Sequence, residues 1–265
     1  MLGSRLRAVG ISAARVTEHP APAAVRGILL DIEGTTTPIA FVTQVLFPYA
    51  RKHLRSHLEE HAGETEYESL VARLREEHAS ASRDGETVPP WADQPLTARL
   101  AAAAAYVEWL MDRDRKSTAL KELQGRIWED GYRRRELAGD VFPDVRPALR
   151  RWREQQLQVG IFSSGSVLAQ QLLFRHSSAG DLTPLLHWHF DTRVGAKTDP
   201  ESYRRIASLV ELPPDRVLFL SDVTRELDAA RSAGMQVRLV VRPGNAPVQS
   251  EHGYQVIRSL DEIAG

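Results

Sequence analysis

Short apolar runs alternate with amphipathic stretches throughout the second half of the chain. Such an alternation of strands and helices predicts a parallel, doubly wound α/β sheet. The expected helices cover residues 145–155, 167–174, 200–210 and 225–233, and the expected strands cover 158–162, 189–192, 216–220, 236–241 and 255–257.

One more strand is expected near the N-terminus, at residues 28–30. These residues form a continuous apolar run that stops at an acidic, glycine-containing turn, DIEGTT. A short apolar run that ends in turn-forming residues is typical of a central strand of a parallel sheet, buried on both faces.

The segment between this strand and the alternating half is helical. Charged residues recur with helical spacing at 51–60 and 66–78, and helices are expected at 97–112 and 117–135. These roughly 95 residues are far too many for a single crossover connection. We therefore expect a Rossmann-like core at 26–42 and 138–265, an inserted all-helical cap at 43–137, and a disordered N-terminal tail at 1–25.

Composition excludes several classes of protein. The chain has 265 residues, 34 basic and 35 acidic side chains, and no cysteine. This near-neutral balance lacks the basic surface on which duplex binding relies. Without cysteine there is no disulfide, thiolate nucleophile or iron–sulfur centre. No apolar run approaches the roughly 20 residues that span a bilayer. We expect a monomeric, cytoplasmic protein with a small-molecule partner and no nucleic-acid or membrane partner.

The N-terminal stretch MLGSRLRAVGISAARVT is basic and free of acidic residues. It resembles a transit peptide superficially, but it lacks the apolar centre of a secretory signal. We favour a disordered tail or a start codon placed too early, and import into an organelle stays open as the alternative.

Polar side chains follow four of the predicted strands. Ligands of an open parallel sheet bind beyond the carboxyl ends of its strands, so these side chains are expected to share one site. They are Asp31 and Glu33 after the first strand, Ser163 and Ser164 after the second, Lys197 after the third, and Asp222 with Glu226 after the fourth.

The carboxylates in this set suit phosphoryl transfer. Asp31, at the tip of a buried strand, can attack phosphorus and form an acyl-phosphate. Glu33 can protonate the leaving oxygen and later deprotonate the attacking water. Asp222 offers hard oxygen ligands for Mg²⁺, which offsets the repulsion between carboxylate and phosphate.

The remaining residues suit binding of the phosphoryl oxygens. Ser163 or Ser164 would hold them at a helix N-terminus, and Lys197 would balance the charge of the transition state. Taken alone, each motif is equally compatible with a turn, a helix cap or a solvated lysine. Their common place at predicted strand ends favours one shared site.

The four motifs DIEGTT, SSG, GAK and SDVTRE, in this order, resemble those of the haloacid-dehalogenase-like phosphohydrolases. Longer stretches are similar to the enolase-phosphatase family of methionine salvage, also called acireductone synthases. The resemblance extends over residues 27–260, apart from 61–95, and it is carried by DIEGTTTPIAFVTQVLFPYAR, GIFSSGSVLAQQLLFRHSSAGDL and HFDTRVGAKTDPESYRRIA.

This resemblance implies a two-step reaction on 2,3-diketo-5-methylthiopentyl-1-phosphate. The diketone is first enolised, and the phosphate ester is then hydrolysed through an aspartyl-phosphate. By position, Asp31, Glu33 and Asp222 correspond to the family's residues for one Mg²⁺ per subunit, and Asp31 also to its nucleophile. Ser163, Ser164 and Lys197 correspond to its substrate-binding residues. Two alternatives stay open, namely a small-molecule phosphatase of the same superfamily without enolase activity and a non-catalytic binding protein on this scaffold.

Glu33 and Lys197 carry two narrower hypotheses. Most of the superfamily has aspartate where this chain has Glu33, so the longer side chain would also reach the carbon-bound proton; the alternative is that glutamate merely fits a different turn. Only four of the 34 basic residues are lysine. A lysine kept at 197 indicates a need for a compact charge beside phosphate, whereas Lys52, Lys116 and Lys121 lie at no evident site.

Several aromatic and histidine residues are expected to be structural. His53, His57 and His61 recur every four residues, and without an acidic partner in the repeat they predict a solvated helix face rather than a zinc site. Trp91 could close over the substrate's tail, although loop packing is favoured. Three tryptophans with helical apolar spacing are predicted to lie in the core, namely Trp109, Trp128 and Trp152.

Overall fold

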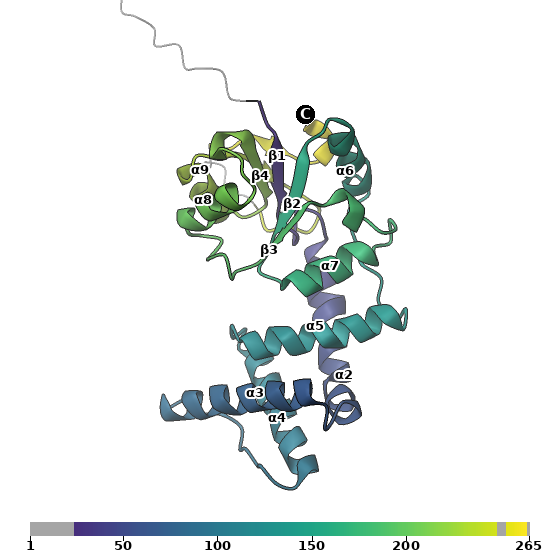
Figure 1. Cartoon of the computed structure of the whole chain (residues 1–265), viewed down its shortest axis with the longest axis vertical. Coiled ribbons are helices and arrows are strands. Elements are labelled where there is room, and N and C mark those ends of the chain that lie inside the picture. The colour runs from purple at the N-terminus through teal and green to yellow at the C-terminus, as the bar shows by residue number, and fades with distance from the viewer. Residues whose placement is uncertain (1–23, 248–252, 264–265) are drawn as a thin grey trace, which may run out of the picture.

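A single parallel sheet organises the protein. The computed structural model describes residues 24–247 and 253–263, and its six strands run in the order β3-β2-β1-β4-β5-β6 (Figure 1). The strands are β1 (Gly27–Leu30), β2 (Gln158–Phe162), β3 (Trp188–Phe190), β4 (Val217–Ser221), β5 (Gln236–Val240) and β6 (Val256–Ile257).

Helices cover both faces of this sheet, as the doubly wound prediction requires. On one face, Ile28 and Leu30 of β1 share an apolar core with Trp152. On the other face, Leu29 packs in a second core with Tyr203 and Leu227. The helices of the sheet layer are α6 (Val145–Glu154), α7 (Val167–Arg175), α8 (Pro200–Leu209) and α9 (Thr224–Ser232).

The remaining α-helices and one π-helical turn come between β1 and α6 in the chain. They lie at the end of the sheet where the strands terminate (Figure 1). Their buried side chains belong to the same apolar core as one face of the sheet. They are α1 (Ile39–Phe41), a π-helical turn η1 (Val42–Leu46), α2 (Phe47–Glu60), α3 (Thr65–Arg83), α4 (Leu96–Asp112) and α5 (Thr118–Arg133). We refer to α2–α5 as the cap.

The predicted strands and helices are confirmed, with three boundary corrections. The helix expected at 66–78 continues to Arg83. The third strand ends at Phe190 rather than Thr192, because Asp191 begins a turn in which its Oδ1 accepts a hydrogen bond from Arg193 N at 2.9 Å. The first cap helix starts well before residue 51, because the helical backbone continues without a break from Ile39 through the π-helical turn. The predicted tail at 1–25 lies almost wholly outside the described residues.

The aromatic predictions have mixed outcomes. Trp109, Trp128 and Trp152 are buried, as expected. Trp91 packs against His78 within the cap, which agrees with loop packing. The prediction of a solvated histidine face is wrong, because His57 is only 4% exposed.

No helix in the described part of the chain is long and apolar enough to cross a membrane.

Candidate active site

The six residues to which the sequence assigns a role all line one cavity of about 720 Å³ between the sheet and the cap. That volume is in the range of small-molecule sites. The sheet brings the six together because its parallel strands end at the same edge. Asp31 and Glu33 follow β1, Ser163 and Ser164 follow β2, Lys197 lies in the loop after β3, and Asp222 follows β4.

Lys197 and Asp31 form a buried ion pair at the floor of the cavity. Lys197 Nζ lies 2.5 Å from Asp31 Oδ1 and 2.7 Å from Glu226 Oε2. Although burial opposes its charge, Asp31 and Glu226 raise the pKa of Lys197 above its usual value. The ammonium is therefore held charged between two carboxylates, and it fixes the orientation of Asp31.

The loop after β3 is built to hold Lys197 in place. Tyr203 is a buried residue of α8, and its OH donates a hydrogen bond to the carbonyl oxygen of Lys197 at 2.7 Å. Ser202 Oγ, also on α8, donates a hydrogen bond to the carbonyl oxygen of Ala196 at 2.8 Å. Gly195 has a φ of +139°, and a Cβ there would lie 2.2 Å from Ser202 Oγ. The loop can approach α8 this closely because residue 195 is glycine.

Asp222 reaches the end of β1 across Gly34. A Cβ on Gly34 would lie 2.3 Å from Asp222 Oδ2, and its φ of +71° also favours glycine. Desolvation and the nearby Asp31 raise the pKa of Asp222 to about 7. The same two causes raise the pKa of Glu33. Asp222 and Glu33 thus hold their protons more tightly than carboxylates in water do.

The donor set fits a hard divalent cation. Asp31, Glu33, Asp222 and Glu226 line the core side of the cavity, and Lys197 is the one cation from the described part of the core that lines it with them. Among the described residues, neither Asp222 Oδ1 nor Asn245 Oδ1 finds a hydrogen-bond partner, although both atoms are buried. Buried oxygens without partners and an excess of carboxylates are compatible with a Mg²⁺ site made of oxygen ligands.

The serine motif forms the turn between β2 and α7. Ser163 is buried, and its Oγ accepts a hydrogen bond from Gly165 N at 3.1 Å. Ser164 is exposed to the cavity. Ser166 caps α7, since its Oγ accepts from Ala169 N at 3.3 Å. The turn thereby places the positive N-terminal end of α7 towards the cavity, where it can hold an anion.

The cap supplies the opposite wall, which mixes apolar and cationic side chains. Lys121 Nζ donates to the carbonyl oxygen of Ser164 at 3.1 Å and lies 3.4 Å from Thr192 Oγ1, so it bridges α5 and the core loops. The apolar part of the wall includes Phe47, Met111 and Trp128, and its cations are Arg51, Arg115, Lys116 and Lys121.

Two groups of cavity residues were missed or undervalued on the sequence. Glu226 was noted beside Asp222 but given no role, whereas it is the second carboxylate partner of Lys197. The expectation that Lys116 and Lys121 lie at no evident site is wrong, since both line the cavity. The scarcity of lysine was the available signal, because three of the four lysines of the chain line this cavity.

Comparison with known proteins agrees with this fold and site. The family model described as haloacid dehalogenase-like hydrolase matches residues 25–234. An enolase-phosphatase E1 of Synechococcus elongatus is 48% identical over 92% of this chain and 100% of its own length. Another, from Branchiostoma floridae, is 48% identical over 89% of this chain and 83% of its own length.

A solved structure has the same fold. The UTR4 protein of Saccharomyces cerevisiae superposes with a TM-score of 0.73 at 31% identity, covering 90% of this chain and 100% of its own. The fold and the strand-end site define a haloacid dehalogenase-like hydrolase. Within that class, the chain belongs to the enolase-phosphatase E1 family.

Proposed function

We propose that the cavity binds 2,3-diketo-5-methylthiopentyl-1-phosphate and converts it to the 1,2-dihydroxy-3-keto product and phosphate, in methionine salvage. The observation that carries the proposal is the cluster at the cavity floor, where a buried lysine lies within 2.7 Å of two carboxylates and faces an excess of oxygen donors. The names of the relatives, all enolase-phosphatases, support the two-step activity.

Asp31, Glu33 and Asp222 are the residues that would hold one Mg²⁺ per subunit. The partnerless Oδ1 of Asp222 among the described residues supports this set. When bound, the ion would neutralise negative charge between the carboxylates and the phosphate. The residues themselves perform the covalent and proton-transfer steps.

Hydrolysis of the ester proceeds through Asp31. Lys197 orients the Asp31 carboxylate, which attacks phosphorus while the bond from phosphorus to the ester oxygen breaks. Glu33, whose pKa is raised by burial and by Asp31, donates a proton to the leaving oxygen. The Glu33 carboxylate then takes a proton from the water that attacks the aspartyl-phosphate, and this step releases phosphate and regenerates Asp31.

Enolisation precedes hydrolysis and requires removal of a proton from the carbon that bears the phosphate ester. Glu33 lines the cavity two residues after Asp31, and its side chain is one methylene longer than that of aspartate. We assign its ionised carboxylate to this proton. The neighbouring carbonyl oxygen takes a proton from water and becomes the enol hydroxyl, and Glu33 is left protonated and ready to act as the acid in the next step.

The two walls of the cavity bind different parts of the substrate. Ser163, Ser164 and Lys197 hold the phosphoryl group at the end of α7. The apolar cap wall, with Met111 and Trp128, accommodates the methylthio tail. In this proposal the core domain comprises residues 26–42 and 138–265 and supplies the chemistry, while the cap at 43–137 supplies substrate selection.

The test is to incubate the protein with the diketo phosphate and Mg²⁺ and to follow the enol absorbance and phosphate release together. We expect the enol to form before phosphate appears, and Asp31→Asn to abolish phosphate release. Phosphate release without any enol would instead identify a phosphatase that lacks enolase activity. Absence of Mg²⁺-dependent phosphate release from any phosphate ester would identify a non-catalytic binding protein.

A further inference from the structure

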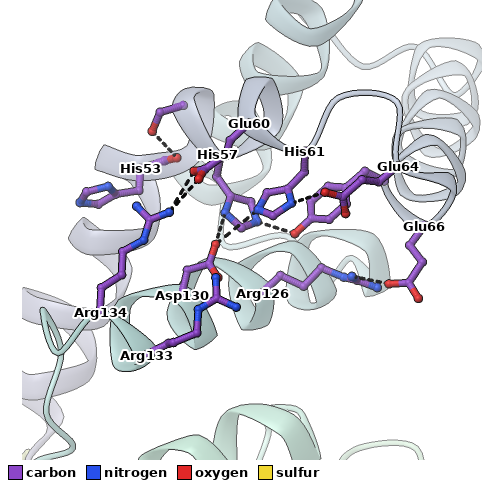
Figure 2. A network of polar contacts seen from close by, with 12 residues as sticks. His53, His57, Glu60, His61, Glu64, Glu66, Arg126, Asp130, Arg133 and Arg134 are labelled. Atoms are coloured by element: carbon purple, nitrogen blue, oxygen red, sulfur yellow. Dashed lines mark hydrogen bonds and ion pairs between the residues drawn. The ribbon is translucent and has the colours of Figure 1, made fainter.

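Two imidazoles and a carboxylate lie together inside the cap. None of the three belongs to the described residues that line the cavity. His57 and His61 are one helical turn apart on α2, and Asp130 faces them from α5 (Figure 2). His57 Nδ1 lies 3.1 Å and His61 Nε2 lies 3.4 Å from Asp130 Oδ2. Among the described residues, this is the group of potential metal ligands whose donor atoms all lie within 4.8 Å of one another.

The distances from Asp130 Oδ2 to the two rings match those of a tetrahedral zinc site. Zinc binds nitrogen and carboxylate oxygen at about 2.0–2.2 Å, so two ligands of a tetrahedral ion lie roughly 3.3–3.5 Å apart. The two measured separations from Asp130 Oδ2, 3.1 and 3.4 Å, lie close to that range. The donor atoms of the two rings lie within 4.8 Å of each other, so an ion can bind all three groups once the rings close by at most about 1.5 Å.

Each ligand is also oriented by a second polar group. His57 Nε2 lies 2.6 Å from Tyr67 OH, and His61 Nδ1 lies 2.8 Å from Glu64 Oε1. Arg133 forms an ion pair with Asp130 Oδ1, which leaves Oδ2 turned towards the two rings (Figure 2). Proteins orient metal-binding histidines in this way, through an oxygen partner on the ring nitrogen that does not bind the metal.

Both ring nitrogens of His61 face carboxylates, and a neutral ring can donate to only one of them. Glu64 can only accept a hydrogen bond, so His61 Nδ1 carries the proton that it shares with Glu64. In the neutral ring, His61 Nε2 is then an acceptor that faces another acceptor, Asp130 Oδ2. Either a second proton on the ring or a metal ion relieves this contact.

We propose that His57, His61 and Asp130 bind one Zn²⁺, with water as the fourth ligand. Imidazole and carboxylate ligands in this number are typical of zinc rather than of Mg²⁺. The His57 proton moves to Nε2 and is donated to Tyr67 OH, which frees Nδ1 for the metal.

The ion joins the two helices that carry much of the cap wall. α5 contributes Lys121 and Trp128 to the cavity, and α2 contributes Phe47 and Arg51. Binding zinc to the folded cap, and not to the unfolded chain, raises the stability of the protein. The site is structural, and it does not depend on the reaction proposed for the cavity.

The test is a calorimetric titration of the full chain with Zn²⁺ in excess Mg²⁺, so that the carboxylate site is already filled. We expect one equivalent to bind and to raise the melting temperature. His61→Gln should weaken binding by more than about 100-fold, and Glu64→Gln by roughly 10–100-fold as an outer-shell change. The matched control is His53→Gln, because His53 lies one turn before His57 on α2 and is not one of the three proposed ligands. This variant should bind zinc as tightly as the wild type.

Cobalt provides a second readout, because four-coordinate Co²⁺ absorbs visible light strongly. We expect this absorption in the wild type and in His53→Gln, and its loss in His61→Gln. Equal melting temperatures of the metal-free proteins would show that the loss does not come from misfolding. Zinc binding that is the same in His61→Gln and wild type, or no zinc binding at all in excess Mg²⁺, would overturn the proposal.

Discussion

Lys197 is placed so tightly that the shape of its charge should matter. Its Nζ contacts both Asp31 and Glu226, and the side chain is 7% exposed. A planar guanidinium is larger and cannot occupy this position without displacing Asp31. We expect Lys197→Arg to lower kcat/KM by about 100-fold or more, equivalent to about 2.7 kcal/mol.

The matched control for this substitution is Lys52→Arg, since Lys52 is exposed on α2. It should keep kcat/KM within about twofold of the wild type. Steady-state kinetics of phosphate release measures both variants. Equal activity of the two would show that a point charge is not required at residue 197.

Glu33 tests whether side-chain length separates the two half-reactions. If the added methylene allows Glu33 to reach the carbon-bound proton, Glu33→Asp should slow enol formation by roughly 10–100-fold, within the range of general base catalysis. Hydrolysis of a simple phosphate ester should fall much less, because aspartate can still protonate a leaving oxygen. Glu33→Gln should impair both steps. Full rates for both steps in Glu33→Asp, followed by stopped-flow absorbance, would contradict the length hypothesis.

Asp222 makes Mg²⁺ binding sensitive to pH. Its pKa of about 7 means that protons and metal compete for the same carboxylate near neutrality. The ionised fraction rises as pH rises through 7, so affinity for Mg²⁺ should increase by about tenfold between pH 6 and pH 8. Calorimetry at each pH measures this slope. It should persist in Glu226→Gln, which removes a neighbouring acidic group whose pKa is also raised. A flat profile in the wild type would refute the assignment.

Sequence reasoning found the residues whose role follows from position at a strand end, and missed those whose role follows from packing. Asp31, Ser163 and Asp222 each follow an apolar run directly, so topology alone brings them together. The acidic partner of His57 and His61 is Asp130, 69 or more residues away on another helix. No periodicity within α2 could reveal that contact, because it depends on how two helices pack.

At the scale of elements, the π-helical turn η1 is tied to α5 by one indole. Trp128 Nε1 donates to the carbonyl oxygen of Leu46 at 2.8 Å, and Trp128 is 7% exposed. Trp128→Phe keeps most of the ring but leaves this buried carbonyl without its donor. We expect a loss of about 1–3 kcal/mol in the free energy of unfolding, measured by urea denaturation.

The same change at Trp91 serves as the control. Trp91 Nε1 donates at 2.8 Å to Asp93, whose carboxylate is exposed and can bind water instead. Trp91→Phe should therefore reduce stability by less than about 1 kcal/mol. Equal losses for the two variants would show that the indole bond to η1 has no special weight. The helical stretch that ends in α2 was expected to start near residue 51, because its charged positions begin there. It starts at Ile39 instead, and its additional first part contains the buried residues Phe41, Val42 and Leu46.

At the scale of the whole molecule, the sheet and the cap enclose the cavity together, and Lys121 connects them. Its ammonium reaches from α5 to the carbonyl oxygen of Ser164, beside the end of α7, and to Thr192 in the loop after β3. These bonds are solvent-accessible, so each contributes little to the stability of the fold. They do hold the cap wall against the turn between β2 and α7, and a cationic group beside that turn would also attract a phosphorylated substrate.

We therefore expect Lys121→Met to affect binding rather than chemistry or folding. KM should rise by about 3–10-fold while kcat changes by less than about twofold, because the nucleophile and the acid are untouched. The melting temperature should shift by no more than roughly 2–4 °C. Lys52→Met, which removes an exposed lysine from the same cap, should leave KM unchanged. A large fall in kcat for Lys121→Met would place this lysine among the groups that stabilise the transition state, and the cap would then contribute to the chemistry as well as to the enclosure of the site.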